Sequence, residues 1–503
     1  MSTNSGTAVA AFFREHQYFL LLLALYVVFA TVMLDHYPRV WVDEPWEAAT
    51  GYTLSTEGRM YNPVLENYSG YDKVLLQPRL FLSLATAPVF ALFGFGPVTG
   101  RLVSGFFGFV MLIALYAFTK KFFTRRAALL AVWFVTIETM MFISYRTIRP
   151  EIYLAAFEIS SLYFFFRGIR ARAVRDFIWA GLLCGIALWV HPNALFHICA
   201  LAVVLLLAGG KQIWTSRLSW SFAAAVLVGV LPYLVYVVVN DAQNSFSTFY
   251  LQLDNRTNVI AQHNWLATSV QGEWNRIVEY AQFPNRVFLV LFYAVVWFAS
   301  LFSKKKEARY LAIMVAAHAF LSLALLANKT IFYSASILPL LCILAASMAD
   351  EWLGEARTLF VRLRQISSRQ HWLPSASLAL VVLFSLNQLA GDAGLVWRNK
   401  DCPYSETIRR LQTVIPPNAR VWGSITFWFG FYQQPYRSQY THFRELETFK
   451  PEYLITGDQE VWGKEFWMEV REKAEQTAQT RGTLVAEFPK NCYGTLRVYR
   501  LHW

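Results

Sequence analysis

The chain has 503 residues, of which 56% are hydrophobic and 17% aromatic, whereas only 16% carry a charge. A soluble globular protein has about a quarter of its residues charged, so this composition excludes an ordinary soluble domain and indicates a polytopic α-helical membrane protein. The net charge is +12, but the basic residues gather in short loops between apolar segments. That distribution is typical of membrane topology rather than of nucleic-acid binding. We therefore expect membrane lipids, and no nucleic acid, among its partners.

Apolar segments that are long enough to form membrane helices recur through the chain up to about residue 390. They lie at 17–35, 98–117, 127–147, 152–166, 177–190, 193–209, 219–239, 287–302, 310–327, 331–348 and 374–390. The sequence thus predicts about 11 membrane-spanning helices. The residues before the first segment include neither a basic stretch nor a clear cleavage site, so we expect that segment to remain as an anchor.

Lysine and arginine cluster in every second connection between these segments. The basic connections lie at 120–126, 167–175, 211–217, 304–309 and 357–369. Because such loops stay in the cytoplasm, the other connections are expected outside it. The apolar segment Leu80–Phe95 would break this alternation if it crossed, so we expect it to lie flat, as a juxtamembrane helix, or to be re-entrant. The loop from His36 to Pro97 is then wholly extracytoplasmic.

After residue 390 the composition becomes polar and charged, with many turn residues. Short alternating apolar runs interleave with helical patterns at Ser405–Val414 and Lys464–Ala478, which indicates a small α/β domain. We therefore expect a transmembrane domain at 1–390 and an extracytoplasmic α/β domain at 391–503.

Two of the five cysteines, Cys402 and Cys492, lie outside the apolar segments. Both fall on the oxidising side of the membrane in this topology, so we predict a disulfide between them. The alternative is two unpaired thiols, because a sequence cannot show whether the two Cα atoms come within about 7 Å. The cysteine and histidine spacing does not suggest a metal site.

Polar residues gather where several spans reach the outer face. The segment after the first span contains Asp43 and Glu44, two adjacent carboxylates that are costly to bury beside a membrane. Further candidates on the same side are Arg101, Arg149, Glu151, His191, Lys329 and Tyr333. For Arg101 and His191 a structural role at a helix end is the simpler alternative. The convergence of acidic and basic groups on one side favours a site that handles a charged group next to lipid.

An ordered set of short motifs resembles the polytopic GT-C glycosyltransferases. The motifs are Asp43-Glu44, Gly58-Arg59-Met60-Tyr61-Asn62-Pro63, Gln77-Pro78-Arg79-Leu80, Leu92-Phe93-Gly94, Gly100-Arg101-Leu102-Val103-Ser104 and Arg149-Pro150-Glu151. Within that superfamily the chain is most similar to the group that contains protein O-mannosyltransferases and the lipid A aminoarabinose transferase. The similarity extends over residues 15–390 and the layout of the C-terminal region, and its specificity comes from the ordered set.

The resemblance implies a GT-C fold and a hexosyl- or pentosyltransferase. The donor would be a polyprenyl-phosphate-linked sugar, the acceptor a lipid, glycan or protein, and the transfer inverting, on the extracytoplasmic face of a bacterial inner membrane or plasma membrane. The resemblance places Asp43 as the catalytic base, with Glu44 beside it and Glu151 at the family's second acidic position. The substrate-binding candidates are Arg59, Lys73, Arg79, Arg101, Arg149, His191, Arg256, Lys329 and Tyr333.

These assignments agree with the chemistry of the reaction. A carboxylate can take a proton from the attacking acceptor. Arginine and lysine can stabilise the negative charge that grows on the leaving phosphate without help from a metal. A single displacement of this kind inverts the anomeric centre and needs no second carboxylate as a nucleophile.

The sequence departs from the family at two positions. The aminoarabinose transferase has an acidic-Lys-Pro triplet where this chain has Leu76-Gln77-Pro78, and Lys73 or Arg79 is the candidate replacement for its lysine. Leu253 stands about where the family's metal site needs a histidine. We therefore expect an enzyme that is independent of metal or weakly dependent on it, with a divalent cation as the open alternative, and aminoarabinose is not assigned as the sugar.

The main alternative is a transporter or flippase for an anionic lipid or sugar. Such proteins place charges near the bilayer midplane and often contain inverted repeats. Here the charges lie at the ends of the spans, and the sequence has no visible internal repeat. A non-catalytic membrane scaffold is a weaker alternative, because it leaves the charged residues unexplained.

Overall fold

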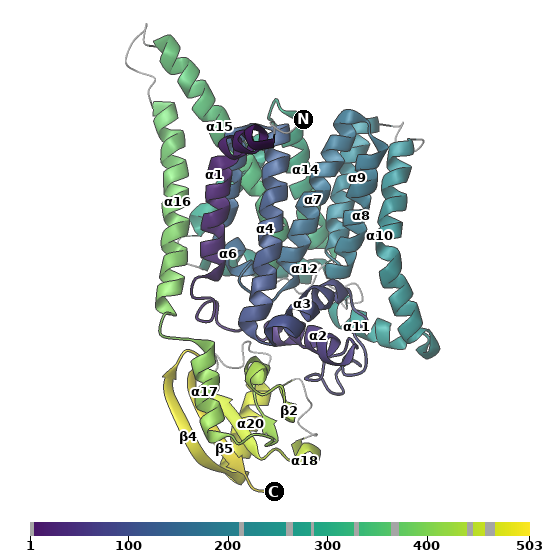
Figure 1. Ribbon diagram of the computed structural model, residues 1–503, viewed down its shortest axis with the longest axis vertical. Helices are drawn as coiled ribbons and strands as arrows, with labels where there is room; N and C mark the ends of the chain where they lie inside the picture. Colours follow the sequence, from purple (N-terminus) through teal and green to yellow (C-terminus); the bar gives the residue numbers. More distant parts are fainter. Residues whose placement is uncertain are drawn as a thin grey trace.

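The computed structural model describes residues 5–210, 216–257, 265–282, 286–325, 331–363, 372–439, 446–457 and 468–503. Figure 1 shows a bundle of long helices with a smaller sheet-containing unit against one end. We call this end of the bundle the domain end; the N-terminus of the chain lies at the opposite end.

Each predicted span falls on helices of the bundle. These are α1 (Ser5–Thr31), α4 (Pro97–Phe122), α5 (Arg125–Ile137), α6 (Thr139–Ser144), α7 (Pro150–Ala171), α8 (Val174–Val190), α9 (Ala194–Gly209), α10 (Arg217–Asp241), α13 (Val287–Leu301), α14 (Lys306–Leu325), α15 (Leu338–Leu363) and α16 (Trp372–Arg398). Within the described residues, six helices are long and apolar enough to cross a membrane, and three shorter helices are apolar. The chain is an integral membrane protein, and the total of about 11 spans stays a prediction.

The predicted span 127–147 is two helices, because the chain breaks at Glu138. This residue has an extended backbone, and its side chain accepts a hydrogen bond from the Met141 N–H at 2.9 Å, which caps α6. Its second oxygen accepts a hydrogen bond from the Tyr280 hydroxyl at 2.9 Å. The break ends α5 early, and the short α6 then leads into residues 145–149 at the domain end.

Two helices lie beside each other at the domain end, between α1 and α4 in the chain (Figure 1). They are α2 (Asp43–Glu57) and α3 (Leu80–Phe93). With 14 residues, α3 is about 21 Å long, which is too short to cross an apolar core of about 30 Å. The helices approach closely at Gly51, where a Cβ atom would lie 2.2 Å from the Thr86 hydroxyl oxygen. The expected placement of α3 flat beside the membrane stays a prediction.

This arrangement leads to an expected labelling result. A cysteine at Leu92, whose side chain is 77% exposed, should react with an impermeant maleimide only from the outside of sealed vesicles. A cysteine beside Phe122, at the exposed Lys121, should react only from the cytoplasmic side. The background for both would be a variant without the free cysteines Cys184, Cys199 and Cys342. Reaction of both positions from the same side would contradict the flat placement of α3.

Three further helical segments approach the domain end from the second half of the bundle. Two of them, α11 (Ser247–Thr257) and α12 (Trp265–Gln282), follow α10 and the short helix η2 (Ala242–Asn244) in the chain. The third is the 3₁₀ helix η3 (Ile331–Ser336), which precedes α15. The predicted span 331–348 therefore begins as a 3₁₀ helix and continues as α15. Because 3₁₀ helices are short and weakly bonded, the position of η3 depends on its contacts with α6, α7, α12 and α15.

The C-terminal unit contains a five-stranded sheet with helices. Its elements are α17 (Tyr404–Val414), β1 (Val421–Trp422), η4 (Ile425–Gly430), β2 (Tyr436–Arg437), α18 (Leu446–Phe449), β3 (Tyr453–Gly457), α20 (Met468–Arg481), β4 (Gly482–Asn491) and β5 (Gly494–Leu501). The strand order is β2-β1-β3-β5-β4. Strands β2, β1 and β3 pair in parallel, whereas β5 is antiparallel to both β3 and β4.

A disulfide joins Cys402 to Cys492, with 5.5 Å between the Cα atoms and a sequence separation of 90 residues. Closing a loop of that length is expected to stabilise the folded chain by about 4 kcal/mol as an upper limit. The double variant Cys402→Ser/Cys492→Ser should therefore unfold at a clearly lower denaturant concentration in detergent. Cys199→Ser, which removes a free cysteine from α9, is the matched control. Equal unfolding midpoints for the double variant and the control would contradict this expectation.

Candidate functional site

A buried ion pair between Glu44 and Arg101 fixes the start of α2. Arg101 donates to both carboxylate oxygens, at 2.9 and 2.7 Å, and to the Leu34 carbonyl at 2.6 Å. The same carboxylate accepts the backbone N–H groups of Trp41 and Ile148, each at 3.1 Å. Glu44 thus accepts four hydrogen bonds and is fully buried. This arrangement favours a structural role for Glu44 and Arg101 over the catalytic and binding roles predicted for them.

A second group of charges surrounds Arg149. Its guanidinium donates to Glu151 at 2.8 and 3.1 Å, pairs with Asp43, and lies 4.0 Å from the centre of the Phe332 ring. Asp43 has 38% of its side chain exposed, whereas Arg149 and Glu151 have 6% and 3%. Burial lowers the pKa of Arg149, but the charges of Glu151 and Asp43 outweigh it and hold this pKa above its usual range. Asp43 is therefore the carboxylate of this group that a second molecule can reach.

Local sequence explains how these side chains come together. Pro150 occupies the first turn of α7 and keeps the preceding Arg149 extended, at φ −143° and ψ 148°. Asp43 and Glu151 lie in the first turns of α2 and α7, where the helix dipole favours a negative charge. Two helix N-termini thus present carboxylates to one arginine.

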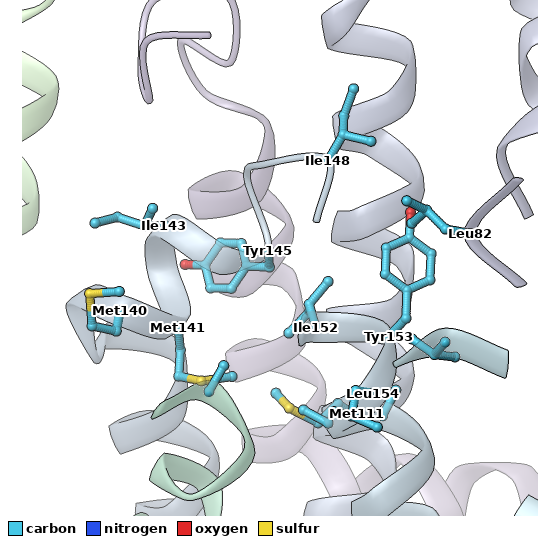
Figure 2. Packing of buried hydrophobic residues seen from close by; sticks show 14 of the residues in the cluster. Leu82, Met111, Met140, Met141, Ile143, Tyr145, Ile148, Ile152, Tyr153 and Leu154 are labelled. Atoms are coloured by element: carbon cyan, nitrogen blue, oxygen red, sulfur yellow. The ribbon is translucent and has the colours of Figure 1, made fainter. Parts of the chain in front are cut away.

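Apolar packing supports the segment that leads to Arg149. Figure 2 shows Tyr145, Ile148, Ile152 and Tyr153 in the buried cluster around the start of α7. All four are at most 1% exposed. Packing of this density resists small displacements, so the position of the neighbouring Arg149 is well defined.

His191 and Tyr333 form the next part of the site. His191 ends α8, and its Nδ1 accepts the Asn193 N–H at 3.1 Å. Its ring centre lies 5.4 Å from that of Tyr333. Tyr333 follows Phe332 in η3, so this one turn contacts both Arg149 and His191. The structure thereby groups Asp43, Arg149, Glu151, His191 and Tyr333.

The remaining predicted cations are placed elsewhere or are not described. Arg79 is buried and pairs with Glu47, which joins α3 to α2. Arg59 follows the far end of the 15-residue α2, so it lies about 20 Å along the helix from Asp43. Lys73 is exposed in the loop before α3. Lys329 lies outside the described residues, and so does the side chain of Arg256.

Two residues of this region were not predicted from the sequence. Glu47 lies three residues after Glu44 and four after Asp43. On a helix this spacing places all three carboxylates on neighbouring positions of one face, which could have indicated that Glu47 belongs to the same region. Phe332 lies over Arg149, and only its position next to Tyr333 pointed to it.

Gln252, the neighbour of Leu253 on α11, joins this helix to the chain around Leu76 and Gln77. Its side-chain oxygen accepts the N–H groups of Leu76 at 2.8 Å and Gln77 at 3.1 Å, and its amide donates to the Val74 carbonyl at 2.8 Å. Gln252 is fully buried. Within the described part of the chain, no three His, Cys, Asp or Glu side chains gather as metal ligands. An amide bonded to backbone groups does not fit a cation at this position.

Comparison with known proteins finds solved structures whose fold is similar to that of this chain. The family model described as dolichyl-phosphate-mannose-protein mannosyltransferase matches residues 78–236. ArnT from Cupriavidus metallidurans, solved with undecaprenyl phosphate, is 16% identical with a TM-score of 0.62, over 96% of this chain and 98% of that one. The oligosaccharyltransferase AglB from Archaeoglobus fulgidus, solved with an inhibitory peptide and a dolichol-phosphate, is 13% identical with a TM-score of 0.55, over 97% and 75%. No curated protein sequence matches the chain. The predicted GT-C resemblance is confirmed at the level of the fold.

Proposed function

We propose that the protein is a glycosyltransferase that moves a sugar from a polyprenyl-phosphate donor to an acceptor. The observation that carries this proposal is the partly exposed carboxylate of Asp43, which is paired with the buried Arg149 at the domain end. The fold shared with ArnT and AglB supports it, because those proteins were solved with undecaprenyl phosphate and dolichol-phosphate.

The site has the groups that a single displacement requires. Asp43 takes the proton from the acceptor as the acceptor oxygen attacks the anomeric carbon. The bond between that carbon and the phosphate oxygen breaks, and polyprenyl phosphate leaves with an additional negative charge. Arg149 stabilises this charge, and Tyr333 and His191 line the same region. Attack opposite the leaving group makes the transfer inverting.

In this proposal the transfer is independent of metal or depends on it only weakly. Three carboxylates near the site are already paired with arginines, Glu44 with Arg101 and both Asp43 and Glu151 with Arg149. The contacts of Gln252 hold α11 against Val74 and Leu76 without a cation. A hexose or pentose remains the expected sugar class, and a lipid, glycan or protein the acceptor class.

The domain end is the extracytoplasmic face in this proposal, and the membrane is a bacterial inner membrane or plasma membrane. The basic loop at 120–126 supports this orientation, because Lys120 pairs with Glu15 near the start of α1 at the opposite end. The Cys402–Cys492 disulfide at the domain end also supports it, since disulfides persist on the oxidising side of a membrane.

Arg149→Ala is expected to weaken use of the donor. Each lost charge-assisted contact costs on the order of 1.5–3 kcal/mol, so kcat/KM for the donor should fall by roughly 10-fold to 150-fold. Steady-state kinetics with varied donor measures this. Arg175→Ala, which removes an exposed arginine at the start of α8, is the matched control. Unchanged kinetics in both Arg149→Ala and Lys329→Ala would show that the donor phosphate binds elsewhere. Arg59 and Arg256 would then be the next candidates.

A transfer assay tests the proposal. The purified protein in lipid nanodiscs would be incubated with one radiolabelled polyprenyl-phosphate-linked sugar at a time and a membrane extract as the source of acceptors. We expect label to leave the donor and to appear in a lipid, glycan or protein fraction. Label that stays on the donor in every combination, while the donor or its sugar crosses the membrane in reconstituted vesicles, would favour the transporter alternative.

A further inference from the structure

The C-terminal unit holds the chain segment that leads to Asp43. Residues 32–42, between α1 and α2, form turns and irregular structure without a regular helix or strand. Contacts from the C-terminal part of the chain follow one another along this segment. The Asp35 carbonyl accepts the Tyr404 N–H at 3.0 Å, and the Asp35 carboxylate accepts the Ser405 N–H at 3.2 Å. The His36 Nδ1 lies 2.6 Å from the Lys400 carbonyl oxygen, and the Arg39 Nε–H donates to the Asn399 side-chain oxygen at 3.1 Å. The Val40 N–H donates to the Tyr493 hydroxyl at 2.9 Å.

The contact with Tyr493 is the one nearest to Asp43. The Tyr493 hydroxyl accepts the backbone N–H of Val40, three residues before Asp43, and both residues are buried. Tyr404 and Phe427 pack edge-on against the Tyr493 ring, with ring centres 6.3 and 5.6 Å away. Burial raises the pKa of Tyr493, so the hydroxyl stays protonated and neutral. The tyrosine is thus a fixed acceptor for the backbone just before α2.

The disulfide holds Tyr493 in this place. Tyr493 lies in the turn between β4 and β5, directly after Cys492, and Cys492 is bonded to Cys402. Cys402 in turn precedes Tyr404, whose N–H binds the Asp35 carbonyl. One covalent link therefore connects the two parts of the C-terminal unit that hold the segment at its two ends, Asp35 and Val40.

We propose that Tyr493 is a positioning residue for Asp43 and that the oxidised disulfide is required for this action. A dithiol that reduces the disulfide supplies two electrons and two protons, gives two thiols, and becomes a disulfide itself. The β4–β5 turn is then no longer tied to Cys402, and the Val40 contact loosens. Displacements of about 1 Å at a catalytic group can lower a rate by up to about 100-fold, so the transfer would proceed fully only on the oxidising side of the membrane. This inference rests on the proposed function for its kinetic part alone.

Tyr493→Phe tests the role of the hydroxyl, because it removes one oxygen and keeps the ring. We expect kcat to fall about tenfold or more, while KM for the polyprenyl-phosphate sugar changes less than about twofold. Hydrogen exchange of the amides in residues 39–44 should accelerate. Tyr499→Phe, which alters a half-buried tyrosine on β5, is the matched control and should leave both quantities unchanged.

The disulfide is tested with dithiothreitol and with Cys402→Ser/Cys492→Ser. Reduction of the wild-type protein should lower kcat and accelerate exchange in residues 39–44 to the level of the double variant, which itself should not respond to dithiothreitol. Thermal melting checks that each variant is folded. Should Tyr493→Phe fail to fold, the reduced wild-type protein and the double variant still show whether the β4–β5 turn, held by the disulfide, fixes residues 39–44.

The exchange measurement separates this inference from the proposed function. Unchanged exchange in residues 39–44 after reduction and in both variants would overturn the positioning role, whatever the transfer assay gives. Exchange that accelerates in a protein without transfer activity would support the positioning role and contradict the proposed function. Wild-type kcat in the double variant would overturn the requirement for the disulfide.

Discussion

Asp43→Asn is expected to lower turnover by about 100-fold or more, as the loss of a general base does. Asparagine keeps the size of the side chain and can still accept a hydrogen bond from Arg149, so the fold and the binding of the donor should persist. An amide cannot take the acceptor proton, and the loss should therefore appear in kcat. Single-turnover transfer with saturating donor measures it directly.

A carboxylate elsewhere on α2 provides the control for this substitution. Glu57 ends the helix, exposed and bonded to the Tyr61 hydroxyl at 2.8 and 2.9 Å, and Glu57→Gln should keep wild-type turnover. Near-normal turnover in Asp43→Asn would show that Asp43 is not the base, and Glu151 would be tested next.

Arg101→Met is expected to destabilise the protein by about 3–5 kcal/mol, because it leaves a fully buried carboxylate without its cation. Two of the four hydrogen bonds to Glu44 would be lost, together with the contact to the Leu34 carbonyl. Chemical unfolding in detergent measures the change. The double variant Glu44→Gln/Arg101→Met removes both charges and should be more stable than Arg101→Met alone. A loss below about 1 kcal/mol in Arg101→Met would contradict the structural role of the pair.

The apolar segments of the sequence fall on helices in the structure, because hydrophobicity is a local property. The sequence could not distinguish Asp43 from Glu44, which are neighbours of the same charge. Successive residues on a helix point about 100° apart, so one faces Arg101 and the other Arg149. The partners lie 57 and 106 residues away in the chain, and no local pattern shows which carboxylate is buried.

The break at Glu138 was missed for the same reason. The apolar pattern continues across residues 127–147, and the acid that interrupts it resembles an isolated polar residue. Its hydrogen bond with Tyr280, 142 residues later, stabilises the break and depends on the tertiary fold.

The disulfide could be predicted from the sequence, because composition and topology together placed both Cys402 and Cys492 on the oxidising side of the membrane. The contacts of Gln252 could not be predicted, because no sequence pattern indicates which distant backbone groups a buried glutamine binds.

The proposed reaction breaks the bond between a sugar and polyprenyl phosphate. Nuclear magnetic resonance of a donor labelled with ¹³C at the anomeric carbon detects this cleavage, because that carbon couples to the donor phosphorus. With wild-type protein and acceptor we predict that the phosphorus-coupled signal disappears and that an uncoupled signal of the opposite anomeric configuration replaces it, whereas Asp43→Asn leaves the donor signal in place. A coupled signal that persists with the wild-type protein, for every donor and acceptor offered, would show that the protein does not break this bond.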